Sequence, residues 1–298
     1  MTDLTRRSVL LGAATLAAAG PAFAQGPQQD VVNYQTINGS ALQLRLFAGR
    51  RTALLIDPKR PVDRVAVARI LEAFDRAWGW YADFYRAMPA TKKDYAGRVP
   101  VAEVADQGFA WGATGVEILP SSTTLLLNGA MRDRYNQATF YCMGLNFWAF
   151  GKQLGKIDAF SWGFGEVNRF YAMAAAGITG APWDVDLDFD HYRHSILIDL
   201  LDRYLDDKAL TWQSTLAADK APANPRGWGA SQLAGAFYHR IQRDHGFAGY
   251  QRFCRMLMDA PAAETPKECA SRFVQIARVA TGEDYRWMFK DQSLQLVY

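Results

Sequence analysis

The stretch Gln137-Ala-Thr-Phe-Tyr-Cys-Met-Gly-Leu-Asn-Phe-Trp148 decides the fold of this 298-residue chain. It lies in a largely apolar segment, residues 136–154, whose pattern predicts a helix. Tyr141, Cys142 and Leu145 stand there at positions i, i+1 and i+4. Positions i and i+4 of a helix share one face, whereas i and i+1 diverge by about 100°. Tyr141 and Leu145 are therefore expected on a common face, with Cys142 directed elsewhere.

This stretch resembles the zinc-binding helix of zincin metallopeptidases, His-Glu-x-Gly-His-Asn-Phe-Trp, with every residue of the metal chemistry replaced. A zinc peptidase needs two His at i and i+4 to hold the metal and a Glu at i+1 to take a proton from the metal-bound water. Tyr141 stands at the first His, Cys142 at the Glu and Leu145 at the second His, while Gly144 and residues 146–148 match the surrounding frame.

Glutamate-ligand zincins add a third metal ligand, a Glu on the next helix, and Glu166 lies at a fitting place 21 residues after Leu145. The order of elements is also similar: mixed strands, the motif helix, a Glu-bearing helix and a helical lobe. The ending, Gly246 to Asp284, resembles the C-terminal lobe of enhancin-like, mucin-targeting members. The resemblance implies an α+β, zincin-like fold of two lobes, with a mixed β/α lobe followed by a mostly helical one.

The replaced residues predict a degenerate site made of Tyr141, Cys142, Leu145 and Glu166. One carboxylate cannot form a tetrahedral zinc site, so we expect no cofactor and no hydrolysis. A buried carboxylate needs a donor, and a hydrogen bond from Tyr141 to Glu166 is the first expectation. The alternative is that Glu166 lies near the N-terminus of a helix over 165–176 and is stabilised by the helix dipole.

The N-terminus predicts export. Arg6 and Arg7 form a twin-arginine pattern, a short apolar run follows over residues 12–20, and residues 22–24 offer a small-x-small cleavage site before Gln25. An ordinary N-terminal helix is the alternative. The prediction places the mature chain in the periplasm or outside the cell, with the twin-arginine export machinery as a partner.

Composition narrows the classes of partner. Half of the residues are hydrophobic, 13% are aromatic and the net charge is +3, with basic residues scattered rather than clustered. Nucleic acid is therefore not an expected partner. No segment after the signal is apolar enough to span a bilayer, so no membrane span is expected in the mature chain.

Three cysteines permit at most one internal disulfide. Cys254 and Cys269 flank a Pro-containing turn between two helical patterns, so a disulfide across that hairpin is one prediction and two buried thiols are the other. Cys142 is expected as a buried free thiol.

The remaining pattern divides the mature chain into residues 25–135, rich in strands, and 136–298, almost wholly helical. Strands are expected over 42–46, 51–56, 99–104, 115–119 and 123–127, and a long helix capped by Asp63 over about 64–87. Further helices are expected over 136–154, 165–176, 190–206, 209–219, 230–244, 247–259 and 266–281.

Two other sets of residues suggest binding. His191 and His194 are three apart on a helix that Asp190 would cap, and they could hold a metal or simply be surface histidines. The alternating Asp184, Asp186, Asp188 and Asp190 read as a solvated acidic edge rather than a calcium loop.

Aromatic residues suggest a ligand cleft. Trp111, Trp148 and Trp162 could line one for a peptide or glycan, although aromatic side chains more often fill a core. The sequence thus predicts an exported, zincin-like protein that binds a peptide or glycan without catalysis. The alternative is a metal-dependent hydrolase with a site rebuilt around Glu166.

Overall fold

Short apolar runs near the N-terminus pair into one mixed sheet. The computed structural model describes residues 31–86, 89, 95–105, 110–112, 115–181 and 187–296. In this part of the chain six strands pair in the order β1-β2-β3-β4-β6-β5, with β3, β4 and β6 parallel and the other pairs antiparallel. Their bounds are β1 Val31–Gln35, β2 Ala41–Ala48, β3 Thr52–Ile56, β4 Val99–Glu103, β5 Ala110–Gly112 and β6 Gly115–Ile118.

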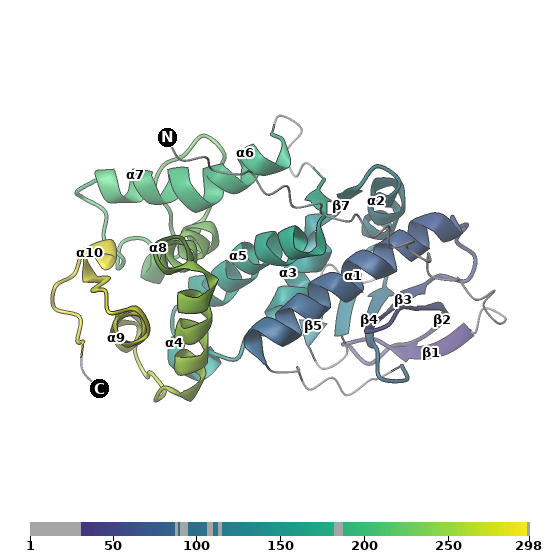
Figure 1. Cartoon of the computed structure of the whole chain (residues 1–298), viewed down its shortest axis with the longest axis horizontal. Helices are drawn as coiled ribbons and strands as arrows, with labels where there is room; N and C mark the ends of the chain where they lie inside the picture. The colour runs from purple at the N-terminus through teal and green to yellow at the C-terminus, as the bar shows by residue number, and fades with distance from the viewer. Residues whose placement is uncertain are drawn as a thin grey trace, which may run out of the picture.

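One face of the sheet is covered by helix α1 (Arg64–Tyr85), which crosses it in Figure 1. Asp63 caps this helix as predicted, because its Oδ1 accepts a hydrogen bond from the Val65 amide at 2.7 Å. Alternation along β3 divides the core: Leu54 and Ile56 face α1, whereas Leu55 joins a smaller cluster on the opposite face.

Residues 123–127 were expected as a strand, and the structure corrects this: they belong to helix α2 (Pro120–Ala130). Pro120 suits the first position of a helix because its missing N–H would have no partner there. The β-branched threonines are accommodated because Thr123 and Thr124 turn their hydroxyls back to the carbonyls of Leu119 and Pro120.

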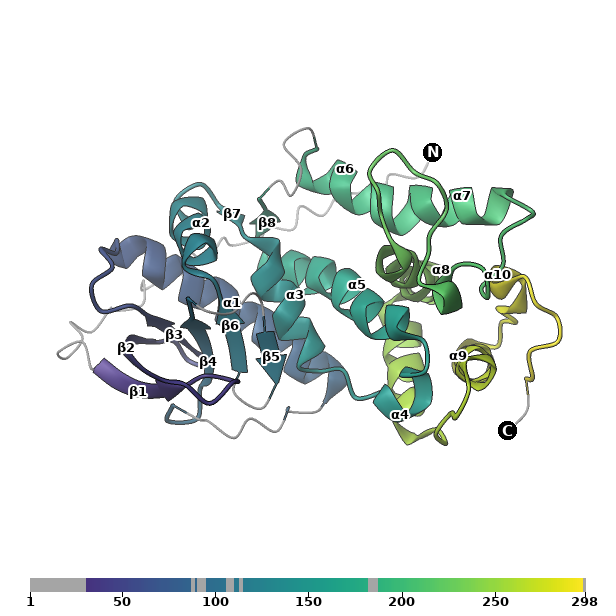
Figure 2. The ribbon, with the colours of Figure 1, turned by 180° about the vertical axis from the view of Figure 1, so that it is seen from behind.

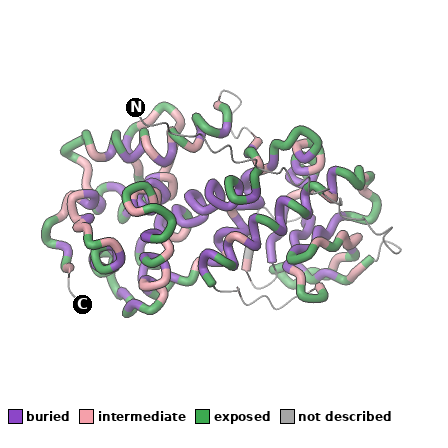
Figure 3. Tube along the Cα trace, in the orientation of Figure 1, coloured by how far each residue is buried: buried purple, intermediate pink, exposed green. Residues whose placement is uncertain are grey.

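The second half is helical around a central, almost wholly buried helix, α5 (Figures 1 to 3). The α+β class and the order of strands followed by helices are therefore as predicted. The elements that follow α2 are β7 Arg134–Tyr135, α3 Gln137–Leu145, α4 Gly151–Leu154, α5 Asp158–Ala176, β8 Thr179–Gly180, α6 Phe189–His194, the π-helical η1 Ser195–Asp199, α7 Leu200–Asp206, the 3-10 turn η2 Leu216–Ala218, α8 Ala230–Asp259, α9 Pro266–Thr281 and α10 Arg286–Phe289.

Several predicted helices differ in extent. The single helix predicted over residues 136–154 is two helices, α3 and α4, separated by residues 146–150. Residues 209–219 form turns and the short η2 rather than a helix. The helices predicted over 230–244 and 247–259 are joined as α8, and the break between them survives as a kink at Gly246, whose φ is +66°.

Glycines allow α5 to approach its two neighbours closely. A Cβ added to Gly163 would lie 2.6 Å from the Ala234 Cβ of α8, and one added to Gly165 would lie 2.8 Å from the Tyr141 ring of α3. The α3–α5–α8 packing that positions the candidate site therefore depends on residues without side chains at these two points.

Of the two alternatives predicted for Cys254 and Cys269, the structure has the two buried thiols rather than the disulfide. Cys254 and Cys269 are both buried free thiols, and so is Cys142. The two thiols have different surroundings, because Cys254 meets the hydroxyls of Tyr85 and Tyr250 while Cys269 meets the backbone of residues 156 and 157.

Among the described residues, no helix combines the length and apolarity needed to cross a bilayer. The predicted signal segment, residues 1–24 with Arg6 and Arg7, lies outside the described residues.

Candidate functional site

Helix α3 supplies three of the residues that the sequence singled out. Asn136 caps it through a hydrogen bond from the Ala138 amide to its side chain at 2.9 Å. Cys142 and Leu145 are buried and Tyr141 is half-buried. Burial raises the pKa of the Cys142 thiol to about 12, so this group is protonated at neutral pH. Burial and the neighbouring Glu166 carboxylate raise the pKa of Tyr141, which stays a neutral phenol.

Glu166 lies in the third turn of α5 and is buried. Stabilisation by the helix dipole is therefore not its explanation, since that effect fades within the first turn. Its Oε1 accepts a hydrogen bond from Gln232 Nε2 of α8 at 3.0 Å, and its Oε2 forms an ion pair with Arg169 Nη2 at 2.6 Å. Burial raises the pKa of Glu166, an effect that the Arg169 guanidinium and the Gln232 hydrogen bond oppose.

Arg169 is the central cation of this site, and its side chain is only 2% exposed. Besides the Glu166 ion pair, its Nη2 donates to the Tyr192 hydroxyl at 2.7 Å. Aromatic rings surround the guanidinium carbon at 4.7 Å (Phe170), 5.3 Å (Tyr192) and 5.8 Å (Tyr141). The positive charge is therefore compensated by one carboxylate and by the faces of several rings. We call Tyr141, Glu166, Arg169, Tyr192 and Gln232 the ion-pair site.

The hydrogen bond that was predicted between Tyr141 and Glu166 is not formed. Both residues are described, and the polar partners of Glu166 are Gln232 and Arg169 instead. Arg169 stands at i+3 from Glu166 on the same helix, so a stronger, charged partner was available at helical spacing.

The residues present do not fit a zinc ion. A zinc site needs several neutral-His, thiolate or carboxylate ligands. Here the candidates are a neutral phenol, a protonated thiol, an apolar Leu145 and a carboxylate already paired with a guanidinium. Nowhere among the described residues do three or more His, Cys, Asp or Glu side chains gather in a way that could hold a metal.

His191 and His194 are placed away from a common metal position. His191 Nδ1 pairs with Asp188 at 2.7 Å, and His194 Nε2 pairs with Asp199 at 3.2 Å. The cap of α6 is Asp188 rather than the predicted Asp190. Asp184 and Asp186 of the predicted acidic edge lie outside the described residues.

The three tryptophans that were predicted to line a cleft differ in their packing and exposure. Trp148 packs edge-on against Phe150 and tilted against Phe164, as a core residue does. Trp162, on α5 one turn before Glu166, is 39% exposed. The backbone of Trp111 belongs to β5, and its side chain lies outside the described part of the structure.

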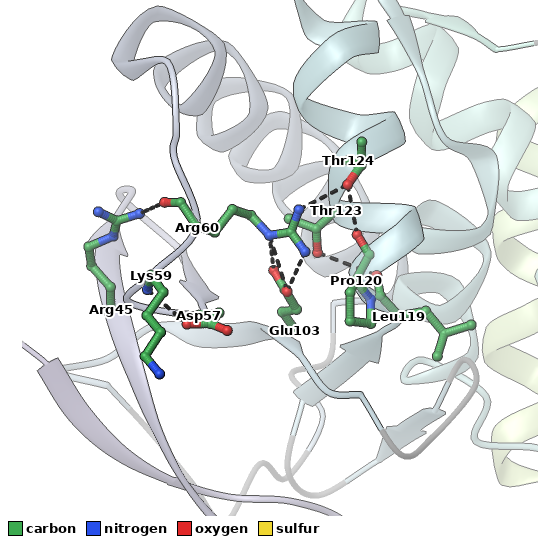
Figure 4. Close-up of polar contacts among 9 residues, drawn as sticks. All are labelled: Arg45, Asp57, Lys59, Arg60, Glu103, Leu119, Pro120, Thr123 and Thr124. Atoms are coloured by element: carbon green, nitrogen blue, oxygen red, sulfur yellow. Dashed lines mark hydrogen bonds and ion pairs between the residues drawn. The ribbon is translucent and has the colours of Figure 1, made fainter.

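A hollow of about 340 Å³ lies beside α1 and α2, where Arg60 and Thr124 contribute to its wall. Figure 4 shows that the Arg60 guanidinium is already engaged: Nη2 meets Glu103 at 2.7 Å and Nη1 donates to Thr124 at 2.9 Å. The Arg60 guanidinium is therefore not available to a ligand in this hollow.

Sequence reasoning missed Arg169, Tyr192 and Gln232. One signal could have indicated Arg169: it is a cation three residues after a predicted buried Glu, within an otherwise apolar helical run. Tyr192 and Gln232 carry no such signal, because other elements bring them to the site.

Comparison with solved structures identifies the fold. A conserved protein of unknown function from Bacillus anthracis superposes with a TM-score of 0.56 at 11% identity, over 83% of this chain and 48% of that one. A metallopeptidase in complex with Tn antigen superposes with a TM-score of 0.54 at 8% identity, over 83% of this chain and 45% of that one. The structure of two CBM32 domains and the M60 catalytic domain of ZmpB from Clostridium perfringens superposes with a TM-score of 0.52 at 12% identity. The superposition covers 83% of this chain and 24% of that one.

The chain spans less than half the length of each of these proteins. No protein-family model matches the chain, and no curated protein matches its sequence. The fold is therefore that of M60-like, zincin-type metallopeptidase domains, reached at very low sequence identity.

Proposed function

We propose that this chain is an exported, non-catalytic binding protein on a zincin-like fold, and that its ligand is a peptide or glycan. The observation that carries the proposal is the Glu166–Arg169 ion pair of 2.6 Å, which engages the one carboxylate of the degenerate metal site. The twin-arginine pattern at Arg6 and Arg7 supports export to the periplasm or beyond.

The chemistry of Cys142 and of the ion-pair site supports a loss of catalysis. Metal-assisted hydrolysis needs a Lewis acid and a base that takes a proton from water. Cys142, at the position of the base, has a pKa raised to about 12 by burial. The Arg169 guanidinium supplies a fixed positive charge beside Glu166, and this charge opposes the approach of a divalent cation. We infer that the guanidinium replaced a metal as the partner of Glu166.

Retention of a binding role is supported by two observations. A metallopeptidase with this fold was solved in complex with Tn antigen, a glycan. On this chain the half-exposed Trp162 presents an aromatic ring on α5, and the apolar faces of sugars pack on such rings. No observation in the described residues favours a hydrolase rebuilt around Glu166, whose polar partners are an arginine and a glutamine.

The test combines metal content, binding and cleavage. The protein is purified from periplasm without chelators, and zinc and other transition metals are measured in the wild type and in Glu166→Ala. A Tn-bearing glycopeptide and its unglycosylated form are then titrated by calorimetry, and their integrity is followed by mass spectrometry. We expect well under one equivalent of metal, and binding of at least one probe without cleavage.

About one equivalent of zinc that is lost in Glu166→Ala, together with cleavage, would overturn the proposal and support the hydrolase. Trp162→Ala tests the contact surface and is expected to weaken binding, because it removes the exposed ring. Thermal unfolding of both variants shows whether an effect comes from misfolding.

A further inference from the structure

A short π-helical segment, η1, interrupts the helical run between α6 and α7. The Leu200 amide donates to the Ser195 carbonyl, the i to i+5 pattern of a π-turn. Such single wide turns are frequent at functional sites because they re-aim side chains. Here the turn brings His194 and Asp199, five residues apart, into contact, with His194 Nε2 3.2 Å from Asp199 Oδ1.

A cavity of about 240 Å³ opens beside this segment. We call it the π-segment cavity; its wall includes Leu187, His194, Asp199, Leu200, Arg203 and Trp228. The opposite wall is a loop that Asn224 holds in shape. Asn224 Oδ1 accepts from the Trp228 amide at 2.8 Å, and its Nδ2 donates to the Trp228 carbonyl at 3.0 Å. The cavity is therefore preformed.

The polar groups of the cavity are not all engaged. Within the described residues, the Arg203 guanidinium forms no hydrogen bond or ion pair, unlike Arg60 beside the larger hollow. Trp228 Nε1 is buried and has no acceptor in that same part of the chain. A buried donor without an acceptor costs free energy, so the Trp228 indole is held in the wall by packing, edge-on to Tyr192, rather than by a hydrogen bond.

Basic side chains prevail around this space. Arg203 and Arg226 line it together with His191 and His194, whereas Asp199 is the carboxylate among its lining residues. The Ser195 hydroxyl is already engaged, because its Oγ donates to the Tyr192 carbonyl at 2.9 Å. Arg binds carboxylates through two parallel N–H groups, and the indole of Trp228 offers an apolar face. A ligand that matches carries a carboxylate, several hydroxyls and an apolar ring face.

We propose that the π-segment cavity binds a carboxylate-bearing sugar unit, with Arg203 on the carboxylate and Trp228 against the ring. Asp199 and Ser195 face the sugar hydroxyls. The size of the cavity suits one saccharide unit rather than an extended chain. This inference deepens the proposed function, since it rests on a glycan ligand and names the class of sugar and the place where it binds.

The cavity is also linked to the ion-pair site. The Trp228 ring stands edge-on to Tyr192 at 5.3 Å, and the Tyr192 hydroxyl accepts from Arg169 at 2.7 Å. The ion pair therefore braces the wall of the cavity, which gives the degenerate site a structural role in binding.

The experiment uses ligand-observed NMR with the full mature chain. Glucuronate is compared with glucose, which lacks only the carboxylate, and with acetate, which lacks the ring. We expect glucuronate to bind at least about tenfold more tightly than either. Arg203→Gln should lower the affinity for glucuronate to that for glucose. Trp228→Phe should weaken the binding of both sugars. Lys208→Gln removes an exposed positive charge outside the cavity and should change nothing.

The outcomes separate this inference from the proposed function. Equal binding of acetate and glucuronate overturns it in favour of a simple anion site. Glucuronate binding that survives Arg203→Gln but is lost in Trp162→Ala also overturns it, while the proposed binding function stands. If none of the sugars binds, the inference fails, and the metal and glycopeptide measurements decide the proposed function independently.

Discussion

The ion-pair site and the π-segment cavity are joined through Tyr192, yet within the part of the chain that the structure describes Arg169 of the first is paired with a carboxylate and Arg203 of the second is not. In the ion-pair site, a 2%-exposed Arg169 and a buried Glu166 neutralise each other, and side chains from α3, α6 and α8 surround them. In the cavity, the exposed Arg203 has no protein partner among the described residues. A charge already paired inside the protein stabilises the fold, whereas an unpaired charge on a preformed wall is available to a ligand.

The largest expected effect comes from breaking the ion pair. Arg169→Gln leaves the Glu166 carboxylate buried without its cation, so we expect the free energy of unfolding to fall by about 3–5 kcal/mol. Urea denaturation followed by circular dichroism measures the loss. The double variant Glu166→Gln with Arg169→Met removes both charges and should recover part of it. Arg193→Gln, which breaks an exposed ion pair, is the control. If Arg169→Gln lowers the free energy of unfolding no more than this control does, the Glu166–Arg169 ion pair does not stabilise the fold.

The next effect is on the pH dependence of stability, at the interface of α5 and α8. His239 Nδ1 lies 2.8 Å from the Tyr171 hydroxyl, and burial together with Arg243 and Arg193 lowers the pKa of His239 to about 4, against a weaker opposing effect of Asp244. The unfolded imidazole titrates near pH 6.5. The contribution of neutral His239 to the free energy of unfolding is therefore fully present above about pH 6.5. It is lost as the pH drops toward 4, by up to about 3 kcal/mol.

Unfolding curves between pH 7.5 and 4 measure this loss, and His239→Gln should remove most of that part of the slope. An identical slope in the wild type and in His239→Gln would contradict the assignment.

A smaller effect is expected from closing the space between α5 and α8. The added Cβ of Gly163→Ala would lie 2.6 Å from both the Ala234 Cβ and the Gly235 amide nitrogen, so we expect a loss of about 1–3 kcal/mol. Gly151→Ala is the matched control, because its nearest contact lies at 3.9 Å. Thermal melts of the two variants should differ clearly. Equal melts would show that the helices can shift without cost.

The smallest effect on stability is expected in the cavity. Arg203→Gln should change the free energy of unfolding by less than about 0.5 kcal/mol, because the guanidinium has no partner to lose. Set beside Arg169→Gln, this variant completes the comparison: one arginine matters for folding and the other for binding. A destabilisation comparable to that of Arg169→Gln, measured in the same urea titration, would remove the distinction.

Much of the fold could be predicted because its signals are local. Alternating and continuous apolar runs indicated β2 and β3, and Asp63 indicated the start of α1. The prediction was wrong at residues 123–127, where β-branched threonines favoured a strand and their hydroxyls instead bond back to helical carbonyls. For Cys254 and Cys269 the sequence left a disulfide and two buried thiols open, and the structure has the thiols, since spacing along the chain does not reveal which way two buried side chains face.

The sequence alone determined that Tyr141 and Leu145 share one helix face while Cys142 points elsewhere, because helical spacing fixes these directions without reference to the rest of the fold. The resemblance to a zincin helix added the prediction that these positions correspond to its metal chemistry. Tertiary structure decided what surrounds them. Glu166 found its cation within its own helix, but Gln232 completes the site from 66 residues away in sequence. Contacts over such separations depend on how α5 packs against its neighbours, and no local pattern encodes that packing. The same holds for the π-segment cavity, where a turn and a distant loop meet only in the folded chain.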